Sequence, residues 1–327
     1  MALVRDDADR FSRLIADCAQ TMGLDRTLVE KDYWAIEALR AVHQGFNIDI
    51  AGSSVHIQPI FKGGTSLSKA FGLIKRFSED VDLLVPVPVG TDGGYSQQQR
   101  ADVLKGTTEA VCDALGIPGA RGGGRRGVDR HWLYPYDSRA GATRTSAVEP
   151  SIRIEVTAMG GENPRSLRAV TSMVAEHART IAGFPSYADL VALGIVTLAP
   201  ERTLVEKLAM LHDAAHQAAE GAPRRLETAG RHYYDIAMLL RDDNVRSRLN
   251  SDWVTKIAAD ADRWSARGGY PFTPRPDSGF AESPAFTSTQ LSTVVQASFD
   301  AAMTWVWDER PTLEDCMAEV ADNSELL

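Results

Sequence analysis

The sequence predicts an α+β fold, with strands and helices first and a mainly helical part after them. Apolar residues occupy every second position in 80–85 and 151–157, which is typical of strands with one buried face. Apolar residues recur with the helical period in three other segments: 6–21, 26–44 and 96–115. Beyond Gly194 helical patterns dominate. We therefore expect two domains, residues 1–193 and residues 194–327.

A glycine turn lies between a short strand and a short helix in the first domain. The sequence predicts a strand over 57–61, a sharp turn at Gly63-Gly64 and a helix over 65–70. Unpaired backbone amides at such a turn and the dipole of the following helix both favour an anion. The predicted phosphate-binding residues are Gly63, Gly64, Thr65 and Ser66.

The strand over 80–85 carries two aspartates two positions apart. Strand alternation places Asp80 and Asp82 on one face and Val81 and Leu83 on the other. Two carboxylates roughly 6–7 Å apart along a strand can share Mg²⁺, which prefers oxygen ligands and is usually completed by substrate phosphates. No basic residue separates the two aspartates, so their like charges cost energy that structure alone does not explain. We interpret both aspartates as ligands of Mg²⁺, with Mn²⁺ as the alternative ion.

A further carboxylate comes from the strand over 151–157. Its apolar side leaves Glu155 on the opposite face, together with Arg153. Glu155 is therefore either a further metal ligand or base, or the partner of Arg153 in a surface ion pair. Its proximity to Asp80 and Asp82 decides between these interpretations.

Two helical segments of the second domain carry charged residues beside their apolar stripes. Lys207 borders the stripe of a helix that begins near Pro200. It can reach a triphosphate as a point charge, or extend its ammonium group out of a domain interface. Asp235 flanks the stripe of a later helix, so two helices docked side by side could bring it opposite Lys207 in an interhelical salt bridge. Arg231, one turn before Asp235, is a candidate contact for phosphate or acceptor RNA.

A segment near 118–150 is rich in glycine and arginine and contains interleaved aromatic residues. Its arginines and alternating aromatics are Arg121, Arg125, Arg126, Arg130, Arg139, Arg144, Trp132, Tyr134 and Tyr136. Arginine with aromatic side chains suits phosphate contact and base stacking. The alternation of the aromatics equally fits a packed edge strand in a hairpin insertion. Both interpretations stay open.

Composition narrows the classes of protein and site. No run of about 18 apolar residues is present and the start lacks a signal-peptide core, so we expect a cytoplasmic protein with no membrane contact. Three dispersed cysteines, Cys18, Cys112 and Cys316, suggest neither a disulfide framework nor a zinc site. His212 and His216 have helical metal-pair spacing but lack a third ligand, so we interpret them as a solvated face. The net charge of −9 means that RNA would have to meet a local basic patch.

Several motifs together resemble those of a known family. They are Phe61-Lys-Gly-Gly-Thr-Ser-Leu-Ser-Lys69, Arg76-Phe-Ser-Glu-Asp-Val-Asp-Leu83, the upstream Val29-Glu-Lys-Asp-Tyr-Trp34, Glu206-Lys-Leu-Ala209 and Arg231-His-Tyr-Tyr-Asp-Ile-Ala-Met-Leu239. In these motifs the chain is similar to the AbiEii-type nucleotidyltransferase toxins, including the MenT group, over roughly residues 25–240. The resemblance implies a DNA polymerase β-like core with a mixed sheet. It also implies a toxin of a toxin–antitoxin or phage-abortive-infection pair.

The resemblance further implies a reaction and a set of site residues. Several members transfer nucleotides from an NTP to the 3′ acceptor end of tRNA, which blocks aminoacylation. Carried onto this sequence, the catalytic residues are Ser78, Asp80, Lys207 and Asp235, and the nucleotide-binding residues are Gly63, Gly64, Thr65, Ser66, Lys69 and Arg231. The metal ligands are Asp80 and Asp82, with Glu155 as the further candidate. The implied partners are NTP, the tRNA acceptor end and an AbiEi-like antitoxin.

Two other functions stay open. The acceptor could be a protein hydroxyl instead of RNA, which keeps the same chemistry. Alternatively, the chain could be a non-catalytic nucleotide-binding partner in a defence complex. The presence of the full set Gly63, Asp80, Asp82, Lys207 and Asp235 weighs against the non-catalytic alternative, because a degenerate copy is expected to lose at least one.

Overall fold

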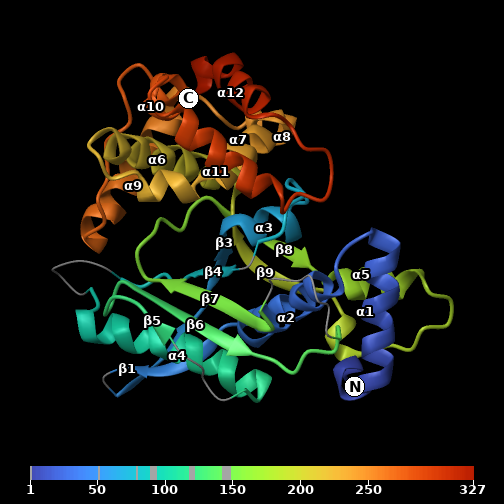
Figure 1. The fold of residues 1–327 in the computed structure, drawn as a ribbon. Coiled ribbons are helices and arrows are strands. Elements are labelled where there is room, and N and C mark those ends of the chain that lie inside the picture. The colour runs from blue at the N-terminus through green and yellow to red at the C-terminus, as the bar shows by residue number, and fades with distance from the viewer. Residues whose placement is uncertain (1, 51, 79, 89–93, 118–121, 142–148) are drawn as a thin grey trace. The chain divides into compact units, whose positions relative to one another are not determined.

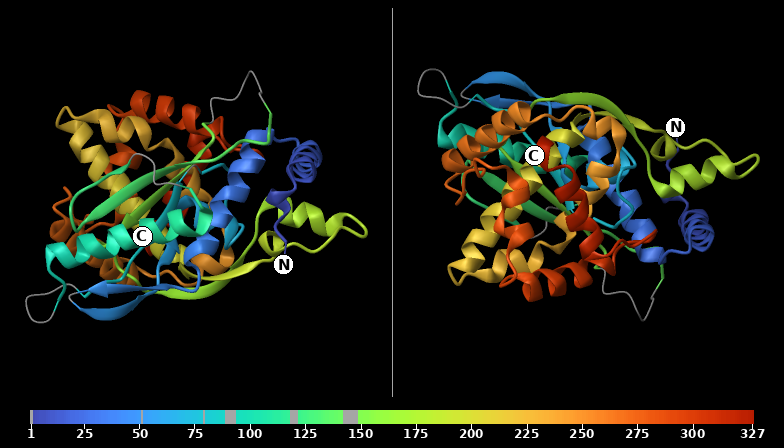
Figure 2. Two further views of the ribbon diagram at one scale, coloured as in Figure 1. Left: turned by 90° about the horizontal axis from the view of Figure 1, so that it is seen from below. Right: turned by 90° about the horizontal axis from the view of Figure 1, so that it is seen from above.

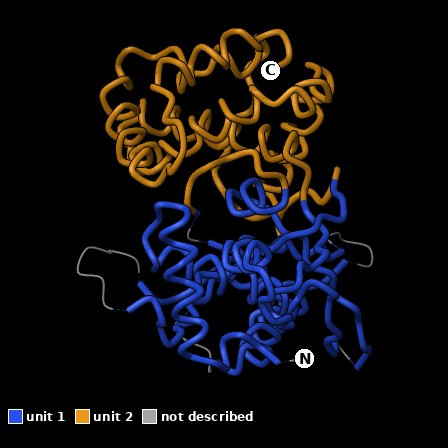
Figure 3. The backbone as a smooth tube through the Cα atoms, turned by 90° about the vertical axis from the view of Figure 1, so that its right-hand side faces the viewer, with its two compact units in different colours: residues 1–70, 78–158, 165–197 blue, residues 71–77, 159–164, 198–327 orange. Residues whose placement is uncertain are grey.

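The computed structural model describes residues 2–50, 52–78, 80–88, 94–117, 122–141 and 149–327. The chain forms two compact units, drawn in blue and orange in Figure 3. Unit 1 comprises residues 1–70, 78–158 and 165–197, and unit 2 comprises residues 71–77, 159–164 and 198–327. The expected division after residue 193 differs from these units chiefly in the two short segments, 71–77 and 159–164, that unit 2 takes from the first half of the chain.

Backbone hydrogen bonds explain why the segment 71–77 belongs to unit 2. The Lys75 amide donates to the Tyr234 hydroxyl at 3.0 Å, and the Trp307 amide donates to the Lys75 carbonyl at 3.0 Å. The Phe77 amide donates to the Trp305 carbonyl at 3.0 Å. These bonds join residues far apart in the sequence, so a pattern of neighbouring residues does not reveal them.

A mixed sheet of seven strands forms the centre of unit 1 within the described residues (Figure 1). In spatial order the strands are β5 (Gly122–Gly123), β6 (Asp129–Pro135), β7 (Ser151–Thr157), β4 (Asp80–Leu84), β3 (Ile60–Lys62), β9 (Leu193–Leu198) and β8 (Arg165–Val170). The pairs β4–β7 and β3–β9 are parallel, whereas β3–β4 and β6–β7 are antiparallel. The predicted α+β fold with a mixed sheet is confirmed.

The helices of unit 1 begin and end where local chemistry places their termini. They are α1 (Ala8–Met22), α2 (Arg26–Val42), α3 (Gly63–Lys69), α4 (Gln97–Leu115) and α5 (Met173–Thr180), with short 3₁₀ turns at η1 (Val4–Asp6) and η2 (Ala188–Leu190). Asp7 and Asp25 cap α1 and α2, and Ser96 forms a capping box with Gln99 on α4. The predicted helices over 6–21, 26–44 and 96–115 are thereby confirmed. Helices α2 and α4 contact each other (Figures 1 and 2). Helix α2 also contacts β7, and helix α4 also contacts β6.

Two strand predictions need correction. The predicted strand over 57–61 is wrong in its bounds, because β2 (Ser53–Ile57) ends in a hairpin with β1 (Phe46–Ile50), and β3 starts only at Ile60. Pro59 lies between them and has no amide to donate to a strand ladder. The interpretation of 131–136 as an edge strand is also wrong, because β6 pairs with β7 on one side and with the two-residue β5 on the other.

Unit 2 is built from helices, as the patterns beyond Gly194 predict. They are α6 (Pro200–Ala219), α7 (Gly230–Arg241), α8 (Asp243–Arg246), α9 (Ser251–Gly268), α10 (Pro284–Thr287), α11 (Ser292–Met303) and α12 (Leu313–Asp322). Short 3₁₀ turns occur at η3 (Pro223–Thr228), η4 (Phe280–Glu282) and η5 (Ser324–Leu326). Helix α7 contacts α6, α11 and α12, and its Tyr233, Ile236 and Leu240 are buried. Because α7 is surrounded in this way, its polar side chains also need partners inside the unit.

His212 on α6 is buried, so the interpretation of a solvated face is wrong for this residue. Its side chain is 2% exposed, with Nε2 3.1 Å from the Pro274 carbonyl and Nδ1 2.8 Å from the Ser283 hydroxyl. A carbonyl can only accept a hydrogen bond, so the proton lies on Nε2 and Nδ1 accepts from Ser283. Both ring nitrogens are thereby satisfied in the neutral imidazole.

This burial predicts that unit 2 loses stability in mild acid. Burial lowers the pKa of His212 from 6.5 to about 4, with a contribution from His216. Between these values the unfolded chain binds more protons than the folded chain, so the free energy of unfolding should fall as the pH drops from 6.5 to 4, by about 1–2 kcal/mol. Urea titrations across this range measure the effect. His212→Asn should make the free energy of unfolding less dependent on pH, whereas His56→Asn, at an exposed histidine, should not. An unchanged dependence on pH in His212→Asn would contradict the attribution of the effect to His212.

Candidate active site

Asp80 and Asp82 project from one face of β4, as the alternation predicts. Val81 and Leu83 on the other face are each 1% exposed, whereas both aspartates are partly exposed. Because β4 and β7 are parallel neighbours, Asp82 lies beside Glu155 and Asp80 beside Arg153. Cross-strand neighbours point to the same side of a sheet. Asp80, Asp82 and Glu155 therefore share one face of the sheet, and the surface that these three residues form is here called the carboxylate face.

Arg153 also lies on the carboxylate face. Its Nε is 2.7 Å from Glu155 Oε1 and 3.7 Å from Asp80 Oδ1. Glu155 therefore agrees with both interpretations: it neighbours Asp82, as a metal ligand or base would, and it pairs with Arg153, as in a surface ion pair. A basic side chain thus lies beside Asp80, and it comes from a strand that is distant in sequence.

The glycine turn lies against the carboxylate face. Gly63 has φ of +75°, and a Cβ built on it would overlap the Asp82 carboxylate. The Thr65 hydroxyl donates to the Asp80 carbonyl at 2.5 Å, and the Ser66 hydroxyl donates to the Gly63 carbonyl at 2.8 Å. The turn and the start of β4 are therefore fixed to each other, and only glycine fits the position next to Asp82.

We expect Gly63→Ala to impair activity beyond its effect on stability. An alanine at positive φ costs about 1–2 kcal/mol, and here its methyl group must also displace the Asp82 carboxylate. Displacement of a site group by about 1 Å can lower a rate about 10²-fold. The matched control is Gly23→Ala, which has φ of +66° and no atom within 4 Å of the added Cβ. Equal transfer rates in the two folded variants would contradict a role for this contact.

Lys69 and Ser78 complete the predicted residues of unit 1. The Lys69 ammonium group pairs with the Asp32 carboxylate, and their side chains are 12% and 4% exposed. Asp32 also accepts a hydrogen bond from the Met173 amide at 2.7 Å, so the carboxylate is held by two elements besides its own helix. Ser78 lies two residues before β4 and is partly exposed. A contact of either residue with phosphate stays a prediction.

Unit 2 brings Lys207 and Asp235 together in a buried cluster. Lys207 Nζ is 2.8 Å from Asp235 Oδ2, and the two side chains are 7% and 0% exposed. Arg76 donates to both carboxylate oxygens of Asp235, each at 2.7 Å, through Nε and Nη2. His232 Nδ1 lies 3.2 Å from Lys207 Nζ. Arg76, Lys207, His232 and Asp235 are named the buried ion cluster below.

The pKa values within the buried ion cluster follow from one carboxylate that faces two cations. Burial alone would raise the pKa of Asp235, but the charges of Arg76 and Lys207 outweigh it and hold the pKa below its usual range. Burial lowers the pKa of Lys207, and Arg76 adds to the effect although Asp235 opposes it. Burial and the charge of Lys207 lower the pKa of His232 well below its usual value, so His232 is neutral near pH 7.

Sequence reasoning identified Lys207 and Asp235 but missed Arg76 and His232. Both missed residues lie inside the motifs that carry the family resemblance, and this position in the sequence could have identified them as site residues. Arg231 precedes His232 in the first turn of α7 and is exposed. Contact of Lys207 or Arg231 with a triphosphate stays a prediction.

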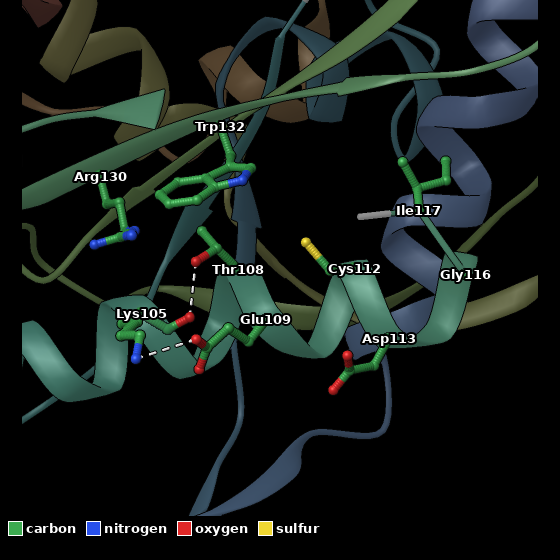
Figure 4. A pocket seen from close by; sticks show the side chains of 9 residues that line it. All are labelled: Lys105, Thr108, Glu109, Cys112, Asp113, Gly116, Ile117, Arg130 and Trp132. Atoms are coloured by element: carbon green, nitrogen blue, oxygen red, sulfur yellow. Dashed lines mark hydrogen bonds and ion pairs between the residues drawn. The ribbon is translucent and has the colours of Figure 1, made fainter. Parts of the chain in front are cut away.

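The aromatic and arginine residues of β6 face away from the carboxylates. A cavity of about 570 Å³ in unit 1 is lined by Arg130 and Trp132 of β6 and by residues of α4, among them Thr108 and Cys112 (Figure 4). His131, between Arg130 and Trp132, is the cross-strand neighbour of Glu155, so strand alternation puts this cavity on the opposite face of the sheet.

The packing of Arg130 and the aromatic residues tests the two interpretations of the glycine- and arginine-rich segment near 118–150. The Arg130 guanidinium lies 4.0 Å from the centre of the Trp132 ring, and Tyr134 and Tyr136 are buried. This agrees with a packed strand for the aromatics. Contact of the segment with RNA stays a prediction, and Arg121 and Arg144 lie outside the described residues.

The carboxylate face fits a divalent cation that binds together with a nucleotide. Across the part of the chain that the structure describes, no group of three or more His, Cys, Asp or Glu side chains is arranged to hold a metal ion by itself. Mg²⁺ typically uses one or two protein carboxylates plus substrate phosphates, so Asp80 and Asp82 match this chemistry. None of the helices among the described residues is both long enough and apolar enough to span a membrane.

Comparison with known proteins agrees with the motifs and the fold. A family model described as nucleotidyl transferase AbiEii toxin, type IV toxin–antitoxin system, matches residues 50–318. This match includes the glycine turn, the carboxylate face and the buried ion cluster. A comparison with curated proteins found no match to the chain. Because the family model covers most of its length, the chain belongs to the AbiEii family of nucleotidyl transferase toxins of type IV toxin–antitoxin systems.

Proposed function

We propose that the protein transfers nucleotides from an NTP to the 3′ acceptor end of tRNA and so blocks translation. Family membership supports an NTP-dependent nucleotidyltransferase that acts as a toxin. The observation that carries the proposal for the site is the placement of Asp80, Asp82 and Glu155 on one face of two adjacent strands, with Gly63 against Asp82.

In this proposal the residues of unit 1 bind the triphosphate and the acceptor hydroxyl. Residues 63–66 hold the β and γ phosphates, and Ser78 donates a hydrogen bond to a nucleotide or phosphate oxygen. Asp80 and Asp82 would hold Mg²⁺, which when bound supplies charge stabilisation and alignment at the α-phosphate. Glu155 would accept the proton of the attacking acceptor hydroxyl as pyrophosphate leaves. No covalent enzyme intermediate is required.

In the same proposal, residues of unit 2 stabilise the negative charge of the triphosphate. Lys207 offsets negative charge on the triphosphate, and Asp235 orients the lysine ammonium group through their 2.8 Å contact. Arg76 holds Asp235 in turn through two hydrogen bonds of 2.7 Å, so it positions the carboxylate without contacting substrate. Arg231, exposed at the start of α7, contacts phosphate or acceptor RNA.

The proposal includes a cytoplasmic site of action and a cognate AbiEi-like antitoxin. A type IV toxin–antitoxin family supports the existence of an antitoxin partner. Expression of the protein alone should arrest growth, and co-expression of the adjacent antitoxin gene should restore it. Harmless expression of active, folded protein would contradict the toxin assignment.

A transfer assay distinguishes the acceptors. Purified protein is incubated with each of the four labelled NTPs and with purified tRNA, total RNA or a protein extract, in Mg²⁺, Mn²⁺ or a chelator. The proposal expects label in tRNA, with loss of the signal in the chelator. Label in protein would favour nucleotidylation of a protein hydroxyl, and its absence from every acceptor would favour a non-catalytic nucleotide-binding partner.

A further inference from the structure

Arg153 occupies the carboxylate face with its positive charge directed at two of the three carboxylates. It stands on β7 next to Asp80 in register, and two positions from Glu155 on the same strand face. Its Nε lies 2.7 Å from Glu155 Oε1 and 3.7 Å from Asp80 Oδ1. The guanidinium thus partly neutralises a set of like charges that would otherwise repel one another.

The same contact places Arg153 in competition with a divalent cation. A metal ion bound by Asp80 would be close to the guanidinium, and two positive charges at such a distance repel each other. The side chain of Arg153 is 44% exposed, and that of Glu155 is 41% exposed. An ion pair this exposed is weak, so the guanidinium can leave it at little cost.

We propose that Arg153 is a resident counter-ion of the carboxylate face, which must release Asp80 when a divalent cation binds. The inference rests on the proposed function, because it takes Asp80 and Asp82 as the metal ligands. It assigns Arg153 a role in setting the metal affinity of the free protein. Arg153 stabilises the carboxylates before the ion arrives and raises the metal concentration at which the site fills.

The test measures metal binding directly, without nucleotide and without turnover. Mn²⁺ titrations followed by electron paramagnetic resonance give the dissociation constant of the full-length protein. Arg153→Gln should bind Mn²⁺ about three- to fivefold more tightly than the unmodified protein, the upper part of the range expected when an exposed ion pair is removed. Arg153→Lys, which keeps the charge, should remain close to the unmodified protein.

Arg125→Gln is the matched control for the loss of one positive charge. Arg125 is 43% exposed and pairs with Asp129 at 2.8 Å in the same unit. The strand neighbour of Asp129 is Thr157, not Asp80 or Asp82. Its substitution should leave Mn²⁺ binding unchanged. If Arg125→Gln and Arg153→Gln increased the affinity for Mn²⁺ equally, the change in net charge alone would explain the effect, and the inference would be overturned.

Asp80→Asn separates failure of this inference from failure of the proposed function. If Asp80→Asn weakens Mn²⁺ binding but Arg153→Gln does not tighten it, the counter-ion role is wrong and the metal assignment stands. If Asp80→Asn binds Mn²⁺ as well as the unmodified protein does, the metal assignment itself is wrong and the counter-ion role falls with it.

Discussion

Asp80→Asn should abolish nucleotide transfer while the protein remains folded. The substitution removes one negative charge from the carboxylate face but keeps the size of the side chain. The backbone of Asp80 still accepts the 2.5 Å hydrogen bond from Thr65, so the glycine turn stays attached to β4. Loss of one group that stabilises the transition state typically lowers the rate about 10²–10³-fold, and a metal ligand should be at the upper end.

Asp129→Asn provides the control for Asp80→Asn. Asp129 is a partly exposed aspartate of the same sheet, 27% exposed against 22% for Asp80, and it also pairs with an arginine. Its substitution should change the transfer rate by less than about twofold, since surface ion pairs contribute little. Transfer by Asp80→Asn at the rate of Asp129→Asn would remove Asp80 from the active site.

Asp235→Asn should destabilise unit 2 strongly. The substitution leaves Arg76 and Lys207 buried and facing each other without the carboxylate that neutralises them. Removal of one partner of a buried ion pair typically costs about 3–5 kcal/mol of unfolding free energy. Because the pKa of Asp235 is depressed in the folded state, its contribution is present above the unfolded value of 3.8 and is lost only as the pH falls through the lower folded pKa.

Urea unfolding at pH 7 measures the effect of Asp235→Asn against a second ion pair on the same helix. Arg241 pairs with Glu319 at 2.7 Å, with 36% and 25% of their side chains exposed. Glu319→Gln should therefore cost at most about 1 kcal/mol. A loss in Asp235→Asn no larger than in Glu319→Gln would show that the buried ion cluster contributes little to stability.

Local patterns were sufficient to predict the elements that carry the candidate site. Alternation alone put Asp80 and Asp82 on one face of β4 and Glu155 on the outer face of β7. The diglycine predicted a turn before a helix at 65–70, whereas α3 already begins at Gly63, where the positive φ favours glycine. These features depend on neighbouring residues only, so they can be read from the chain directly.

Local sequence patterns could not predict the contacts between segments that are distant in the sequence. Arg153 faces Asp80 because β4 and β7 pair in one register, and neither strand specifies that register by itself. Arg76 is separated by 159 positions from Asp235, its partner in the buried ion cluster. His212 likewise owes its burial to Pro274 and Ser283, which follow it by more than fifty residues.

The position of the label in the NTP tests the central claim most directly. The unmodified protein is incubated with tRNA and with NTP labelled at either the α or the γ phosphate. Nucleotidyl transfer at the carboxylate face predicts that α label enters tRNA and γ label leaves as pyrophosphate, and that Asp80→Asn does neither. Entry of γ label into the acceptor, or incorporation of α label by Asp80→Asn at the unmodified rate, would contradict the account.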